Sequence, residues 1–376
     1  MIFLDNASTT KIYDEALNEY NKQSINNFYN ASALYKSGSD VLKLVNNTRN
    51  LILKLLGANN IDNLIFTSGA TEANNMAING SIRKNFGKLL FSYAEHPSVF
   101  NVAKNLENSG YKVEYVNLTS DGVVDEVDFK EKVKDASFVS IMHVCNETGA
   151  VNDIKRLVRI AKASNPNIIF HCDGVQAFGK IQVNVKDLGV DLYTISAHKV
   201  HGPKGVGALY VKKGINLKQS VFGGGQEFGL RSGTENTCGI ISFGVAAEIV
   251  VNNQKTNYEK VKQLKNMFLQ ELTTDFNVSL NSTENCSPYI ISFAVKKVKA
   301  ETILHMAEEQ GVLISNGSAC SSKHTDNRIL KAMGIPAELI ISSVRVSFSE
   351  FNTVDEVITA AKVIKETCNR YIKILK

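Results

Sequence analysis

The chain has 376 residues, of which 44% are hydrophobic and 21% are charged, and its formal net charge is +5. These values are those of an ordinary globular enzyme, and the scattered lysines argue against a nucleic-acid groove. The first ten residues contain Asp5 and no long apolar run, which argues against a secretory signal, and no segment is apolar for long enough to cross a bilayer. The six cysteines form no CxxC pair and no zinc or iron–sulfur spacing, so we expect no metal site and a location in the reducing cytoplasm.

Apolar, β-branched runs alternate with amphipathic stretches through the first part of the chain. Amphipathic helices are expected at residues 74–85 and 153–163, between such runs. This alternation predicts an α/β domain with a mostly parallel sheet, in which ligands bind beyond the carboxyl ends of the strands. The expected strands are residues 64–67, 88–92, 113–116, 138–144, 168–172, 192–196 and 208–211.

The first glycine turn after an expected strand comes at residues 66–72, Phe-Thr-Ser-Gly-Ala-Thr-Glu, where a helix begins. Free N–H groups at a helix N-terminus, together with the Thr71 hydroxyl, make an anion site. Thr71 is also typical of an N-cap, and the two interpretations are compatible because a capping site can hold a phosphate. After the next strand comes His96, followed by Pro97. Its imidazole could stack on an aromatic ring and transfer protons near neutral pH, or it could only begin a helix.

Asp173 directly follows the apolar run at residues 168–172. Taken alone, an aspartate at this position is more often a turn or N-cap residue. It could also pair with a protonated ring nitrogen. Gln176 follows three residues later, where it could donate to an oxygen on the same ring or lie solvated on a helix.

Residues 196–205, Ser-Ala-His-Lys-Val-His-Gly-Pro-Lys-Gly, place Lys199 where a buried strand ends. A lysine that forms a Schiff base must lose its proton, and desolvation near other cations lowers the pKa of such an amine. Ser196 and His198 can bind a phosphate beside it. Lys199 alone would be better explained as a surface lysine in a turn. Together with an anion site, a ring-nitrogen partner and a stacking imidazole at neighbouring strand ends, it indicates pyridoxal 5'-phosphate (PLP).

The pattern changes after residue 225, where a long helical region, shorter strands and a closing helix indicate an α+β domain. We expect a large, PLP-binding domain over residues 15–250 and a small domain that comprises residues 1–14 and 251–376. The elements expected in this second part are a helical region at residues 237–276, strands at residues 287–295 and 344–348, and a helix at residues 353–373.

Two residues of the second part carry chemistry. Cys320 lies in a run of small polar residues, Ser-Asn-Gly-Ser-Ala-Cys-Ser-Ser, that is typical of a loop, so its thiol is either an exposed nucleophile or a chance loop cysteine. Arg345 lies in an apolar strand and needs a carboxylate partner there. An amino-acid substrate could supply it bidentately, and a structural salt bridge is the alternative.

With these motifs in this order, the chain resembles the cysteine desulfurases of the class V aminotransferase superfamily, which have PLP fold-type I. The resemblance runs over essentially the whole length, and the Gly-Ser-Ala-Cys-Ser-Ser form of the loop resembles group I. It implies an α/β fold with a large domain, whose mostly parallel seven-stranded sheet lies between helices, and a smaller α+β C-terminal domain. The segments that carry it are residues 3–10, 67–75, 95–96, 146–149, 173–176, 196–207 and 223–236, the Cys320 loop and Arg345.

The resemblance implies a role for each site residue. Lys199 attaches the cofactor and moves protons, His96 stacks on the ring as an acid/base, and Cys320 attacks the sulfur of L-cysteine. Alanine and a persulfide on Cys320 are the products. Of the remaining cofactor contacts, Asp173 pairs with the ring nitrogen and Gln176 donates to the phenolic oxygen. The phosphate is held by Ala70, Thr71, Ser196 and His198, and by Thr234 from the other subunit. Arg345 and Asn146 bind the substrate carboxylate.

The resemblance also implies partners: a homodimer and a sulfur-acceptor protein, either an iron–sulfur scaffold or a tRNA-thiolation enzyme, with no direct contact to nucleic acid or membrane. A selenocysteine lyase or a class V aminotransferase on the same fold is the alternative activity. Cys320 discriminates, because transamination has no use for a loop thiol. A non-catalytic protein on this fold is a third hypothesis, and the intact Lys199, Asp173 and His96 argue against it.

Overall fold

The computed structural model describes residues 1–83, 87–317 and 327–374. Its centre is a seven-stranded sheet in which one strand, β8, is antiparallel to both neighbours and all other neighbours are parallel. The expected mostly parallel seven-stranded sheet is therefore confirmed. Across the sheet the order is β2 (Asn63–Thr67), β8 (Gly207–Val211), β7 (Leu192–Ser196), β6 (Ile169–Asp173), β5 (Ala136–Ser140), β3 (Lys88–Ser92) and β4 (Val113–Val116).

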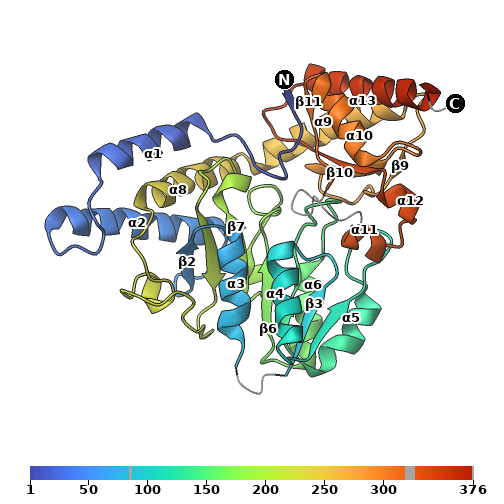
Figure 1. The fold of residues 1–376 in the computed structure, drawn as a ribbon. Coiled ribbons are helices and arrows are strands. Elements are labelled where there is room, and N and C mark those ends of the chain that lie inside the picture. Colours follow the sequence, from blue (N-terminus) through green and yellow to red (C-terminus); the bar gives the residue numbers. More distant parts are fainter. Residues whose placement is uncertain (84–86, 318–326, 375–376) are drawn as a thin grey trace.

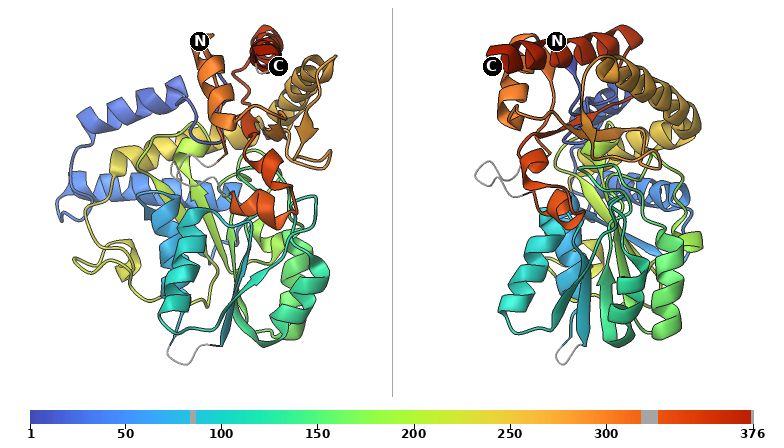
Figure 2. Two further views of the ribbon diagram at one scale, coloured as in Figure 1. Left: turned by 45° about the vertical axis from the view of Figure 1, so that its right-hand side comes forward. Right: turned by 90° about the vertical axis from the view of Figure 1, so that its right-hand side faces the viewer.

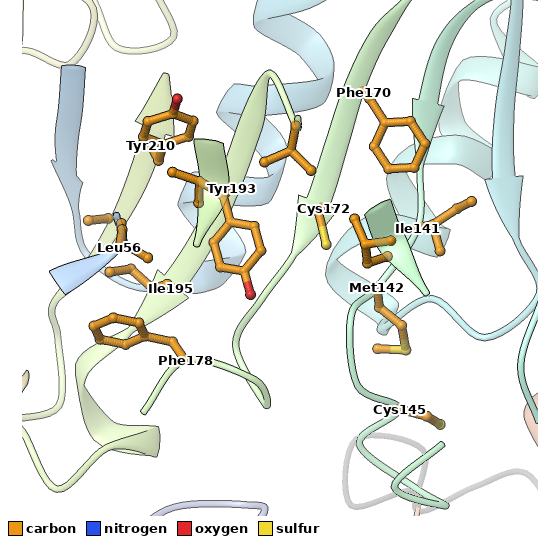
Figure 3. Packing of buried hydrophobic residues seen from close by; sticks show 14 of the residues in the cluster. Leu56, Ile141, Met142, Cys145, Phe170, Cys172, Phe178, Tyr193, Ile195 and Tyr210 are labelled. Carbon is orange, nitrogen blue, oxygen red and sulfur yellow. The ribbon is translucent and has the colours of Figure 1, made fainter. Parts of the chain in front are cut away.

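Helices cover both faces of this sheet (Figures 1 and 2), which is why its strands read as near-continuous apolar runs. On one face α3 and α4 pack on alternate residues such as Leu89 and Phe91. On the other face α2, α6 and α8 cover a larger cluster, of which Figure 3 shows Phe170, Tyr193 and Tyr210 from three neighbouring strands. The helices of this part are α1 (Asp14–Asn26), α2 (Lys36–Leu55), α3 (Ala70–Ser81), α4 (Pro97–Asn108), α5 (Glu126–Lys132), α6 (Ile154–Ser164), α7 (Val185–Leu188) and α8 (Thr237–Asn252), with short 3-10 turns η1 (Val133–Asp135), η2 (Ala197–Lys199) and η3 (Glu227–Gly229).

The second part packs around its own apolar cluster, which includes Leu4 and Ala7 from the N-terminal segment. Ile329 and Leu330 of α11 pack instead into the core of the large sheet. The division at residues 14 and 250 stays a prediction. The elements are β1 (Ile2–Phe3), α9 (Gln254–Thr273), β9 (Ser279–Leu280), β10 (Ile290–Ala294), α10 (Ala300–Glu309), β11 (Val312–Leu313), α11 (Arg328–Ala332), α12 (Ala337–Ile340), β12 (Ser343–Ser347) and α13 (Val354–Ile374). Strands β12, β10 and β9 form an antiparallel sheet in that order. Strands β1 and β11 form a separate parallel pair.

Two expected elements have different bounds. The strand expected at residues 138–144 leaves the sheet after Ser140, although Ile141 and Val144 are still buried. Burial rather than strand pairing requires apolar residues there, and the sequence pattern does not distinguish the two. The helical region expected at 237–276 is two helices separated by Asn253. None of the helices in the described ranges combines the length and apolar character that crossing a membrane requires.

Candidate active site

The site forms where the carboxyl ends of β6 and β7 meet the N-termini of α3 and α4 and the N-terminal segment crosses them. Thr10 anchors that segment, because its backbone N–H and its hydroxyl both donate to the His198 carbonyl, at 2.9 and 3.0 Å. Its hydroxyl oxygen also accepts from the backbone N–H of His201 at 2.8 Å. The first residues of the chain are thus fixed over the end of β7 (Figure 1).

Lys199 lies at the end of η2 and is half-buried under this segment. Its Nζ donates to the carbonyl oxygens of Ala7, at 2.6 Å, and Ser8, at 2.7 Å. The side chain therefore points inward, unlike a surface lysine in a turn. A ligand that takes this amine must replace two carbonyl partners.

Asp173 and Gln176 face the same place. Asp173 is buried at the end of β6, and its carboxylate accepts from Asn74 Nδ2 at 2.8 Å and from the backbone N–H of Val175 at 3.0 Å. Gln176 Nε2 donates to the Ala7 carbonyl at 2.8 Å, the oxygen that also accepts from Lys199. The structure therefore brings together the expected amine, carboxylate and amide.

His96 is the N-cap of α4, and its Nδ1 accepts from the Ser98 backbone N–H at 3.1 Å. The pKa of His96 is lowered by burial, and the positive charges of Lys199, Arg328 and Arg345 lower it further, while Asp173 opposes them. The ring is therefore neutral near pH 7. His96 begins a helix, and the charges of Asp173 and Lys199 act on its ring, so it lies beside the expected site; its role against an aromatic ring stays a prediction.

The phosphate contacts proposed from sequence lie at one point of the sheet. Ser196 pairs with Gly207 across β7 and β8, and a Cβ at Gly207 would lie 2.6 Å from the carbonyl carbon of Gly69. This close approach puts the first turn of α3, with Ala70 and Thr71, next to Ser196. The Ser196 hydroxyl is buried and has no hydrogen-bond partner among the described residues.

His198 completes this corner. Its Nδ1 lies 3.2 Å from the Thr9 hydroxyl, and burial, with the charges of Lys199 and Lys204, lowers the pKa of His198 to about 4. Together with the unpartnered Ser196 hydroxyl and the helix N-terminus, these groups fit a phosphate. The residues present therefore fit PLP.

Arg345 is buried on β12. Its Nη2 donates to Asp5 Oδ1 at 2.8 Å and to Ser8 Oγ at 2.7 Å, and its Nη1 donates to the Asn146 carbonyl at 2.8 Å. The salt bridge that the sequence left as an alternative exists, with Asp5. Arg345 Nε and Asn146 Oδ1 are buried and have no partner within the described ranges, so both have capacity for a ligand.

Two expected site residues are not joined to this cluster. Cys320 lies outside the described residues. Thr234 is exposed on the loop before α8, and no hydrogen bond found among the described residues links it to the site. Thr234 was expected to contact the phosphate of the other subunit, and that expectation stays a prediction.

Sequence reasoning missed two buried ionisable residues beside the site. Lys180 Nζ donates to Gln176 Oε1 at 2.7 Å, and burial, with the charge of Lys199, lowers the pKa of Lys180 to about 7. Glu95 is fully buried and accepts from Ser92 Oγ at 2.6 Å and the Met142 N–H at 2.8 Å, and burial raises its pKa to about 8.

Two polar partners of the site were missed as well, Asn74 and Ser98. Asparagine is usually exposed, yet Asn74 lies on the buried, apolar face of α3 with Ala73 and Met76. That mismatch is the signal that could have revealed it.

The chain matches the family model described as Aminotransferase class-V over residues 2–359. It is 39% identical to a NifS/IcsS protein homolog of Lactobacillus delbrueckii subsp. bulgaricus, covering 95% of this chain and 94% of the relative. It is 37% identical to Cysteine desulfurase IscS of Dictyoglomus turgidum, covering 94% and 91%. A solved structure of a NifS-like protein superposes with a TM-score of 0.91 at 30% identity, covering 97% of this chain and 98% of that one.

Proposed function

The chain belongs to the class-V aminotransferase family, and from that membership we propose that it is a PLP-dependent cysteine desulfurase. The observation that carries the proposal is the position of Ser8 between two functional cations. Lys199 donates to its carbonyl at 2.7 Å and Arg345 donates to its hydroxyl at 2.7 Å. An α-amino acid can therefore place its amino end at Lys199 and its carboxylate at Arg345.

PLP, when bound, supplies an aldehyde that attaches to an amine and a ring that takes up electrons from the substrate. In our proposal Asp173 holds the ring-nitrogen proton, Gln176 donates to the phenolic oxygen, and His96 lies at the ring face. Ala70, Thr71, Ser196 and His198 hold the phosphate. Each of these assignments uses a donor or acceptor that already lies at the site.

Lys199 would leave the two backbone carbonyls when it holds the cofactor, and once the substrate amine has taken its place it would serve as the amine that moves protons. Arg345 exchanges Asp5 and Ser8 for the substrate carboxylate, and the unpartnered Asn146 Oδ1 orients the bound amino acid.

Cys320 is proposed as the sulfur acceptor within the chain. Its thiolate forms an S–S bond to the substrate sulfur as the substrate C–S bond breaks, leaving L-alanine and a persulfide on Cys320. The described residues that flank the Cys320 segment, Gly317 and Asn327, support this role, because both lie beside Glu147. Asn327 Nδ2 donates to Glu147 Oε2, and a Cβ at Gly317 would lie 3.5 Å from the same oxygen, next to Asn146.

We further propose that the enzyme is a cytoplasmic homodimer in which Thr234 reaches the phosphate of the other subunit. Large apolar side chains are exposed on two stretches near the Thr234 loop, residues 28–35 and 222–228, as expected for a surface that is covered in a dimer. They are Phe28, Leu34, Tyr35, Phe222 and Phe228. The persulfide sulfur then passes to an acceptor protein for iron–sulfur cluster assembly or tRNA thiolation.

The test is intact-mass analysis after incubation with L-cysteine. We expect one added sulfur, mapped to the peptide that contains Cys320, and formation of alanine. Cys320→Ala should retain the cofactor and lose sulfide release, whereas Cys238→Ala, which removes a partly exposed thiol at the start of α8, should behave as wild type. Wild-type sulfide release from Cys320→Ala would contradict the proposal, and turnover of selenocysteine with little turnover of cysteine would favour the lyase.

A further inference from the structure

Asn74 and Ser98 form a hydrogen-bonded path between Asp173 and His96. Asn74 Nδ2 lies 2.8 Å from Asp173 Oδ2 and 2.9 Å from Ser98 Oγ. Ser98 Oγ in turn lies 2.8 Å from His96 Nδ1, which also accepts from the Ser98 backbone N–H at 3.1 Å. The path thus joins a residue on β6 to the N-cap of α4 through α3.

The direction of each hydrogen bond in this path is fixed. A backbone N–H can only donate, so His96 Nδ1 is an acceptor and the neutral ring carries its proton on Nε2. The Asn74 amide nitrogen can only donate, so the Ser98 oxygen accepts from it and the Ser98 hydroxyl hydrogen is available to Nδ1. Two donors therefore share the Nδ1 lone pair.

Asp173 determines which way the Asn74 amide faces. An ionised carboxylate only accepts, so rotating the amide would place two oxygens against each other. Asn74 is fully buried, and in the observed orientation its Oδ1 has no hydrogen-bond partner among the described residues. An unsatisfied buried oxygen is destabilising, and the two donated bonds, one of them to a charged group, offset that penalty.

We propose that Asn74 and Ser98 are positioning residues that link the Asp173 carboxylate to His96 and that, with the Ser98 backbone N–H, hold its imidazole as the Nε2–H tautomer. His96 then offers a hydrogen-bond donor at Nε2 and does not accept a proton at Nδ1. Proton acceptance in the site is left to Lys199. This division of roles rests on the proposed function, whereas the tautomer itself does not.

Other charges also act on the same ring. Burial, Lys199, Arg328 and Arg345 favour the neutral imidazole, and Asp173 favours the charged one. Removing the Ser98 hydroxyl leaves all of these groups in place. A change in the pKa of His96 in Ser98→Ala therefore reports the loss of the hydrogen-bonded path, and not a change in the surrounding charges.

The experiment is hydrogen–deuterium exchange at the histidine ring carbon, followed by mass spectrometry across a pH series on the full-length, cofactor-loaded protein. For Ser98→Ala we expect the pKa of His96 to rise by about one unit, because the neutral ring loses a donor. Ser98→Thr retains the hydroxyl and should restore the wild-type value. Ser109→Ala removes an exposed hydroxyl from the other end of the same helix and should change nothing.

A His96 titration in Ser98→Ala that matches wild type, or one that shifts equally in Ser98→Thr, would overturn the proposal. Asn74→Ala, alone and combined with Ser98→Ala, supplies a second measurement on the same residue. We expect the double variant to shift by less than the sum of the single variants, and additive shifts would show that the two residues act independently. The exchange measurement does not involve sulfur, so loss of the desulfurase proposal would leave its result unaffected.

Discussion

The two walls of the active site differ in how their polar groups are satisfied. The helix wall comprises Asn74, His96, Ser98 and Asp173. The N-terminal wall comprises Asp5, Ser8, Lys199 and Arg345. On the helix wall the side chains bind one another within the large sheet and its helices, and their orientation is fixed before any ligand arrives. On the N-terminal wall the two cations bind backbone carbonyls and a carboxylate that a ligand must replace.

This difference separates two tasks of the site. Groups that hold charge and tautomer act best when they do not reorganise during the reaction. Groups that bind a ligand must exchange partners, and their partners in the ligand-free chain keep these cations hydrogen-bonded until the ligand takes their place. Substitutions on the N-terminal wall should therefore impair attachment and binding. Substitutions on the helix wall should instead change protonation.

The largest effect is expected on the N-terminal wall, from Lys199→Ala. The variant should lose the visible absorbance of the attached cofactor, and cysteine turnover should fall by about 10³-fold or more, because no other amine contacts Ala7 and Ser8 in the described structure. Absorbance spectra and sulfide assays measure both. The exposed Lys204 provides the control, since Lys204→Ala should resemble wild type. A wild-type spectrum for Lys199→Ala would assign the attachment to another lysine, and Lys180, which donates to Gln176, would be a candidate.

Arg345→Lys tests substrate binding on the same wall. Lysine retains the charge but loses the planar pair of donors, so KM for cysteine should rise by roughly 30-fold with a smaller change in kcat. Steady-state kinetics separates the two constants. The matched control is Arg156→Lys, which alters an exposed pair with Glu126 and should leave both unchanged. A loss confined to kcat would mean that Arg345 supports the fold of the site rather than the substrate.

Glu95→Gln tests, through stability, the buried carboxyl group that directly precedes His96 of the helix wall. Burial raises the pKa of Glu95 from 4.5 to about 8 in the folded chain, so the folded state holds a proton that the unfolded state releases between these values. The free energy of unfolding of the wild type should therefore fall as pH rises from 4.5 to 8, and Glu95→Gln should be less sensitive by about 4 kcal/mol over that range. Denaturant unfolding at several pH values measures it.

Glu131→Gln, at an exposed position, should keep the wild-type pH dependence. Equal slopes for Glu95→Gln and the wild type would show that Glu95 is ionised in the folded protein. A second negative charge, on Glu95, would then lie beside the helix wall in addition to Asp173.

Much of the fold followed from local pattern. The apolar runs at residues 88–92 and 192–196 predicted β3 and β7 without error, since strands buried on both faces leave a clear signal. The half-buried edge strand β4 was predicted with the same bounds, residues 113–116. Lys199, Asp173 and Ser196 were singled out for the same reason, because polar residues stand out where such runs end. The strand at 138–144 was predicted too long, because burial continues after pairing stops.

The sequence by itself determined the order of the elements and the residues that stand at the ends of the strands. Only the tertiary structure decided the partners of those residues. Asn74 and Asp173 are 99 positions apart and Asp5 and Arg345 are 340 apart, so no local pattern relates them. Hydrogen-bond direction, tautomer and the shifted pKa values of Glu95 and Lys180 arise from groups that meet only when the sheet, the helices and the N-terminal segment pack together.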